Sequence, residues 1–319
     1  MAELQFGWRM QTFSIDGTPG PRLVEQIEDH LRCLDGHFDA VWIQDHLFPE
    51  AAFTPPEWDC VEAWSALAHW AAQFPSYRYG HIVLANSYRP PALLAKMAAT
   101  TQLLTRGRFI LGMGAGWNEP EYRAYNYPYP RAGERIDQLA EAVQLIKAMW
   151  ADSPATFRGA HYTIENAYAN PRPNPAPPIM IGGAGEQKTL RVVARYADWH
   201  NMPSTTLDEV GRKLDVLRER CDEVGRDYDS IYKTGSINAI AVAPTRAEAQ
   251  RIAEGSPFYK PETPSASAVG EPGDVAEQLL RYADLGIRHL IVRFADFPRT
   301  DGAMRFVEQV LPLLKEARR

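Results

Sequence analysis

Short, continuously apolar segments alternate with helical segments along the whole sequence, and this alternation constrains the fold more than any other feature. Apolar segments with the character of strands lie at residues 4–8, 40–43, 79–85, 109–113, 179–181, 198–201, 231–243 and 289–294. Such runs are typical of strands buried on both faces, as parallel sheets require. Nearly all are followed by apolar residues at helical spacing, most clearly Ile136, Leu139 and Val143. About eight units favour an α/β fold, a (β/α)8 TIM barrel with insertion segments, over an open doubly wound sheet, which remains the alternative.

Two segments interrupt this alternation, and we expect them to decorate a single domain over residues 1–319. The first lies at about residues 151–178, where two short strand-like pieces predict a small hairpin before a proline-dense stretch at 171–178. The second lies at about residues 255–270 and reads as a polar loop with several prolines. The alanine- and tryptophan-rich stretch at 60–74 predicts a helix.

Charge and cysteine content narrow the class of protein. The net charge is −6 and no cluster of basic residues is present, so we expect no nucleic-acid partner. The three cysteines lie far apart, which favours a reducing compartment. No apolar run reaches the roughly 18 residues that a membrane span needs, and the first residues do not resemble a signal peptide. We therefore expect a cytoplasmic protein with no membrane association. The eight histidines show no metal-ligand spacing, so we expect no metal site.

The predicted strand ends carry the residues of interest, because α/β barrels place their chemistry at the carboxyl ends of the strands. Gly182, Gly183, Ala184 and Gly185 follow one strand and precede a helix. Consecutive amides in such a turn can bind a phosphate, but the glycines of a lone run like this one more often only make a tight turn. A second glycine run, at 112–116, ends another strand. Neither run has the G-x-G-x-x-G spacing, which disfavours a dinucleotide site of the Rossmann type.

A histidine and an acid end the second predicted strand. Asp45 and His46 are adjacent, and at a strand exit both side chains can reach the mouth of a barrel. An imidazole there could donate a hydrogen bond to a bound ring or shuttle a proton. Taken alone, a histidine in this position is more often structural than catalytic.

Several of these segments together resemble luciferase-like flavin oxidoreductases. The resemblance rests on residues 38–46, 88–100, 106–117 and 178–198, and it extends from about residue 4 to about residue 310. Asp45–His46 and the run Gly114-Ala115-Gly116-Trp117 are most similar to the branch that uses the deazaflavin coenzyme F420.

The resemblance implies positions for a flavin-type cofactor at the carboxyl face of the barrel. His46 would lie beside the ring with Asp45 next to it, and both are the implied catalytic residues. A non-prolyl cis peptide between Ile82 and Val83 would support the ring. The remaining implied cofactor contacts are Ala85, Ala115, Gly116 and Trp117, with Gly182, Gly183, Ala184 and Gly185 around the phosphate.

One departure from the branch concerns the substrate. Trp117 stands where sugar-phosphate dehydrogenases of this branch have a glutamate, which argues against a sugar phosphate. The general acid would then be His46, Glu119 or a water bound with the substrate.

The resemblance implies an F420-dependent oxidoreductase that moves a hydride to or from a small organic molecule. The alternative is an FMN-dependent monooxygenase that works with a separate flavin reductase, and a third possibility is a barrel that binds a flavin without turnover. The expected partners are a small-molecule substrate, a flavin or F420 reductase, and a second copy of the chain in a homodimer.

Overall fold

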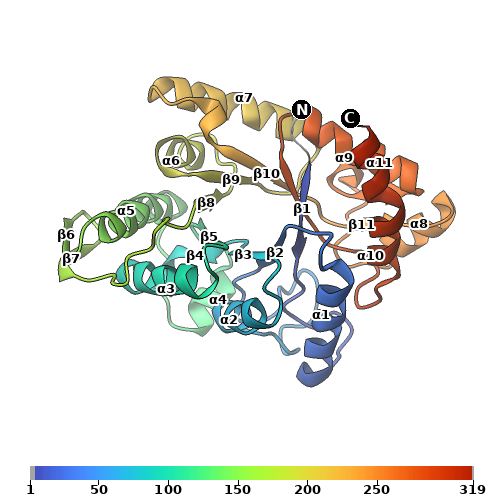
Figure 1. Ribbon diagram of the computed structural model, residues 1–319, viewed down its shortest axis with the longest axis horizontal. Helices are drawn as coiled ribbons and strands as arrows, with labels where there is room; N and C mark the ends of the chain where they lie inside the picture. Colours follow the sequence, from blue (N-terminus) through green and yellow to red (C-terminus); the bar gives the residue numbers. More distant parts are fainter. Residues whose placement is uncertain (1–3, 318–319) are drawn as a thin grey trace.

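Eight parallel strands form a closed ring in the computed structural model, which describes residues 4–317 (Figure 1). In order around the ring they are β1 (Gln5–Arg9), β2 (Ala40–Ile43), β3 (Arg78–His81), β5 (Phe109–Gly114), β8 (Ile179–Gly182), β9 (Trp199–Met202), β10 (Tyr232–Ser236) and β13 (His289–Val292). Parallel pairing of β13 with β1 closes the ring. The expected α/β barrel is therefore confirmed, and the open-sheet alternative is wrong.

Helices surround the ring on the outside (Figure 1). They are α1 (Gly20–Leu34), α2 (Ala63–Gln73), α3 (Pro91–Leu104), α4 (Glu119–Ala124), α5 (Ala132–Ala151), α6 (Thr189–Tyr196), α7 (Leu207–Glu223), α8 (Arg246–Glu254), α9 (Pro272–Asp284), α10 (Asp301–Arg305) and α11 (Leu311–Glu316). A π-helical turn at Phe306–Val310 joins the last two. Within residues 4–317, no helix is both long enough and apolar enough to cross a membrane.

The strands are apolar throughout because both of their faces are buried. In β2, Val41 and Ile43 pack in the layer between strands and helices, whereas Trp42 belongs to a separate cluster with residues of β5, β8, β9 and β13 inside the barrel. Trp42 fits there because its neighbours on the adjoining strands are glycines. A Cβ atom on Gly7 would lie 2.3 Å from Trp42 Nε1, and one on Gly80 would lie 2.5 Å from Trp42 Cζ3.

The first insertion contains the expected hairpin. Strands β6 (Ala155–Arg158) and β7 (Thr163–Ala167) pair antiparallel and follow the end of α5. Figure 1 shows the hairpin projecting at the side of the barrel.

The seventh predicted strand, at 231–243, is wrong as one continuous element. The ring strand β10 ends at Ser236, and β11 (Ile240–Val242) pairs in parallel with β12 (Ala268–Gly270) in a separate sheet. The predicted polar loop at 255–270 therefore contains a strand and a short 3-10 turn at Pro264–Ala266. The residues of β11 are apolar because α8 and α9 cover them, and burial alone does not distinguish one sheet from another.

Two further boundaries differ from the prediction. The segment at 79–85 is interrupted, since β3 ends at His81 and β4 (Leu84–Ala85) resumes after a break. The helix expected from residue 60 begins at Ala63, where the Glu62 carboxylate caps it by accepting from the amides of Trp64 and Ser65.

Candidate active site

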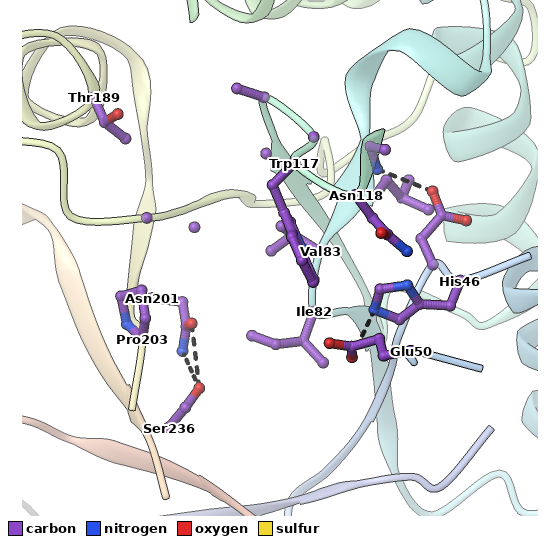
Figure 2. Close-up of a pocket in the computed structure, with 18 of the residues that line it drawn as sticks. His46, Glu50, Ile82, Val83, Trp117, Asn118, Thr189, Asn201, Pro203 and Ser236 are labelled. Carbon is purple, nitrogen blue, oxygen red and sulfur yellow. Dashed lines mark hydrogen bonds and ion pairs between the residues drawn. The ribbon is translucent and has the colours of Figure 1, made fainter. Parts of the chain in front are cut away.

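A cavity of about 480 Å³ opens at the carboxyl ends of the strands. The predicted site residues that line it are Asp45, His46, Ile82, Val83, Ala85, Ala115, Gly116, Trp117, Gly182 and Gly183. Ala184 and Gly185 are not part of its wall. Figure 2 shows His46 and Glu50 on one side and Thr189, Asn201 and Ser236 on the other, with Ile82, Val83 and Trp117 between them.

The chain between β3 and β4 forms the middle of the cavity wall. The peptide bond between Ile82 and Val83 is cis, as the resemblance implied. Val83 fits between the ends of β5 and β8 because both neighbours are glycines. A Cβ atom would lie 2.5 Å from Val83 Cγ2 if placed on Gly114, and 2.8 Å from Val83 Cγ1 if placed on Gly182.

The turn after β8 leads from the cavity to the start of α6. Gly183 has a φ of +117°, which glycine adopts without strain, and its amide donates to the Asn201 carbonyl at 3.2 Å. The amides of Ala184 and Gly185 meet no acceptor within residues 4–317. Thr189, the first residue of α6, contributes its side chain to the cavity wall. Free amides near a helix start suit a phosphate.

The turn after β5 lies next to the turn after β8, since the two strands are neighbours in the ring, and other side chains hold it in place. Gly116 has a φ of +75°, and a Cβ atom there would lie 1.7 Å from the Tyr122 hydroxyl oxygen. Arg135 Nε donates to the Gly116 carbonyl at 3.2 Å, and the guanidinium lies 4.0 Å from the centre of the Tyr129 ring. Trp117 follows at the mouth, where its side chain is 61% exposed and its ring meets His46 edge-on at 6.0 Å between centroids.

His46 lies between two carboxylates that the sequence analysis did not identify. Its Nε2 atom is 3.0 Å from Glu50 Oε1, and its Nδ1 atom is 3.2 Å from Glu121 Oε1. Glu121 is fixed in turn, because it accepts from the Leu47 amide at 2.7 Å and from the Tyr88 hydroxyl at 3.0 Å. His46, Glu50 and Glu121 are all buried and all line the cavity.

This arrangement keeps the imidazole charged. Burial by itself would lower the pKa of His46, but the hydrogen bonds and negative charges of Glu121 and Glu50 outweigh it and raise the pKa to about 9. Burial would raise the pKa values of Glu50 and Glu121. The hydrogen bond of each carboxylate to His46 opposes burial, and both pKa values lie below the ordinary value. Near neutral pH, the group is an imidazolium held by two carboxylates.

Asp45 is also buried, but its carboxylate is engaged by a cation. Arg89 binds it through both nitrogens, with Nη1 2.9 Å from Oδ2 and Nη2 3.0 Å from Oδ1. Asp45 Oδ2 also accepts from the Ala85 amide at 2.9 Å. Asp45 therefore ties the end of β2 to the segment after β3, and a direct catalytic role stays a prediction.

Glu119, considered above as a general acid, lies outside the cavity wall. It forms an exposed ion pair with Arg123 on the next turn of α4. The carboxylate that enters the cavity from this helix is Glu121. The sequence does indicate the start of α4, because Asn118 is a favourable residue before a helix and a proline follows in the first turn. Glu50 had no comparable signal, because it lies on an irregular loop.

No metal site accompanies these residues in the part of the chain that the structure describes, where no group of three or more His, Cys, Asp or Glu side chains could hold an ion. The side chains around His46 can transfer protons and stabilise charge.

Comparison with known proteins places this chain in a family. The chain is 26% identical to an F420-dependent glucose-6-phosphate dehydrogenase of Microbacterium testaceum, over 88% of this chain and 90% of the relative. It is 27% identical to a pyrimidine monooxygenase of Variovorax paradoxus, over 72% of this chain and 71% of the relative. Among solved structures, an F420-dependent secondary alcohol dehydrogenase in complex with an F420–acetone adduct has a similar fold, with a TM-score of 0.82 at 19% identity, covering 98% of this chain and 99% of the other. The profile of the luciferase-like monooxygenase family matches residues 35–264, and the chain therefore belongs to that family.

Proposed function

We propose that the protein is an F420-dependent oxidoreductase that transfers a hydride between the deazaflavin and a small organic substrate. The observation that carries the proposal is the His46 imidazolium, held between Glu50 and Glu121 at the wall of a cavity. The similarity to F420-dependent relatives over most of the chain supports the choice of cofactor.

The residues present fit such a cofactor. A tricyclic ring needs a flat wall, which the backbone around Ile82 and Val83 offers beside the glycines of β5 and β8. Its phosphate needs amide donors, which the turn from Gly183 to Thr189 supplies at the start of α6. The resemblance and the geometry agree on these two regions.

When bound, F420 supplies a ring carbon that accepts or gives a hydride. The protein must then accept or donate the proton that accompanies the hydride. Glu50 Oε1 is bonded to His46, whereas Glu50 Oε2 has no hydrogen-bond partner within residues 4–317. In the oxidation of an alcohol, the Glu50 carboxylate would accept the hydroxyl proton while the hydride leaves the carbon that bears the hydroxyl group. In the reverse direction, the protonated Glu50 carboxyl, still bonded to the His46 imidazolium, would return this proton to the carbonyl oxygen.

Glu121 and Tyr88 position this pair. Glu121 orients the His46 ring through Nδ1, so that Nε2 faces Glu50. The Tyr88 hydroxyl donates to the second oxygen of Glu121. We expect both to affect the protonation of His46 without contacting the substrate.

The second candidate is an FMN-dependent monooxygenase that receives reduced flavin from a separate reductase. The similarity to a pyrimidine monooxygenase favours it. In either case, we expect a homodimer from the resemblance, which light scattering of the purified protein tests.

Titration of the purified protein with oxidised F420 and with FMN tests the proposal. We expect the fluorescence of F420 to change saturably, with a dissociation constant at least tenfold below that of FMN. Tight binding of FMN together with weak or absent binding of F420 would contradict the proposal and favour the monooxygenase. The variant Arg158→Gln, on the exposed hairpin, is the control and should bind both cofactors as the wild type does.

A further inference from the structure

Arg9 is a cation of the cavity wall that the proposed mechanism does not use. It is the last residue of β1 and lines the cavity. Its guanidinium has no hydrogen bond or ion pair within residues 4–317, and its Nε atom is buried without a partner. An arginine in such a place is normally paired, because a buried charge is costly unless hydrogen bonds compensate it.

The nearest carboxylate does not pair with Arg9. Glu50 attracts it at a distance and raises its pKa, but burial has the larger effect and lowers the pKa of Arg9 to about 10. Arg9 therefore stays charged at neutral pH. Glu50 Oε1 is already bonded to His46.

A second arginine adds to the positive charge at this end of the cavity. Arg293, at the end of β13, is buried, donates to the Gln44 side chain at 2.6 Å and packs 3.9 Å from the centre of the Phe258 ring. It repels Arg9 and is also attracted by Glu50. Burial and the repulsion of Arg9 lower the pKa of Arg293. Glu50 attracts both arginines but is already bonded to His46, so Arg9 has no carboxylate partner of its own.

The position of Arg9 in the ring separates it from the phosphate-binding region proposed above. The strand order places β8 four strands from β1 in either direction, on the opposite side of the barrel. A cofactor with its phosphate near Gly183 and its ring against Val83 would leave Arg9 to the substrate.

We propose that Arg9 binds a carboxylate of the substrate, which makes the substrate a small organic acid. The planar guanidinium presents a fork of donors that matches the two oxygens of a carboxylate. A bound carboxylate would also supply the missing negative charge and would place the adjoining carbon skeleton beside Glu50 and His46. The inference rests on the proposed function and specifies the class of substrate.

Binding of carboxylates and their neutral counterparts tests the inference. The probes are acetate, butyrate and benzoate, each compared with its amide, and inorganic phosphate, all titrated into the F420-loaded protein by calorimetry. We expect at least one carboxylate to bind at least tenfold more tightly than its amide. Arg9→Gln should abolish this preference, and Arg9→Lys should retain part of it because the charge remains and the fork is lost.

Two controls distinguish a loss of carboxylate binding in Arg9→Gln from a defect in folding. Arg158→Gln on the exposed hairpin removes an arginine elsewhere and should preserve the preference. Arg9→Gln should unfold at the same temperature as the wild type or at a higher one, since it removes an unpaired and half-buried cation.

The results that would refute a role of Arg9 in carboxylate binding differ from the results that would refute the proposed function. A wild-type protein without carboxylate preference, a preference that survives in Arg9→Gln, or Arg9-dependent binding of phosphate alone would each refute it. F420 affinity is measured first in the same samples. If F420 does not bind, the proposed function fails, and the same probes applied to the free protein still decide the role of Arg9.

Discussion

Replacement of Glu121 by glutamine tests the electrostatic origin of the His46 charge. Glutamine has nearly the shape of glutamate, and its carbonyl oxygen can still accept from the Leu47 amide. The substitution removes one of the two negative charges that face the imidazole. We expect the pKa of His46 to fall, because burial continues to oppose the charge while only Glu50 remains to favour it.

The raised pKa of His46 in the wild type sets the expected effect on the free energy of unfolding. The pKa of His46 is raised from 6.5 to about 9, and at about 1.4 kcal/mol per unit this corresponds to about 3 kcal/mol of unfolding free energy. Since the folded-state value is the higher one, the contribution is complete below pH 6.5 and is lost as the pH rises through 9. With one carboxylate removed, less than half of this contribution should remain, because burial still opposes the charge in full.

Urea unfolding of wild type and Glu121→Gln at intervals from pH 6 to pH 9.5 measures this. Other groups titrate in the same range, but they are common to both proteins and cancel in the difference. We expect the wild type to lose at least about 1.5 kcal/mol more than the variant across the range. Histidine labelled at Cε1 reports the pKa of His46 directly by NMR. If the two proteins show parallel curves of unfolding free energy against pH and the same pKa of His46, the charge on His46 does not depend on Glu121 and the account is refuted.

Three further substitutions test other parts of the site. His46→Ala should slow hydride transfer by about 10²-fold in stopped-flow absorbance of F420, and a wild-type rate would remove His46 from the mechanism. Gly183→Asp should weaken F420 binding well beyond Gly183→Ala, which shares the strain of a positive φ but adds no charge, and equal affinities would show that the turn does not bind phosphate. Asp45→Asn should lower the unfolding free energy by about 2 kcal/mol. It removes the buried one of the two carboxylates that bind Arg89, and the other, Glu62, remains at 2.7 Å. A stability within about 0.5 kcal/mol of wild type would exclude this role.

The fold could be predicted largely because the barrel strands are buried on both faces. Continuous apolarity over 40–43 and 109–113 identified β2 and β5 within one or two residues. The same signal failed at 231–243, where the chain leaves the ring at Ser236 and enters a second sheet under other helices. Apolar residues indicate burial, but they do not indicate which strand will supply the hydrogen bonds.

The candidate site could be predicted where it follows directly from a strand end. His46, Ala115 and Gly183 were found in this way, and all three line the cavity. Glu50 lies on an irregular loop after β2 and reaches His46 only through the course of that loop. Arg9 ends a strand, yet the sequence gives no sign that its guanidinium lacks a partner, because pairing depends on every neighbouring strand of the closed ring.

A crystal structure with F420 bound tests the central claim most directly. The account predicts the deazaflavin ring against Ile82 and Val83, the phosphate at the turn from Gly183 to Thr189, and the reactive edge of the ring next to His46 and Glu50. A structure in which F420 leaves this cavity empty, or in which its ring lies far from His46, would contradict the account.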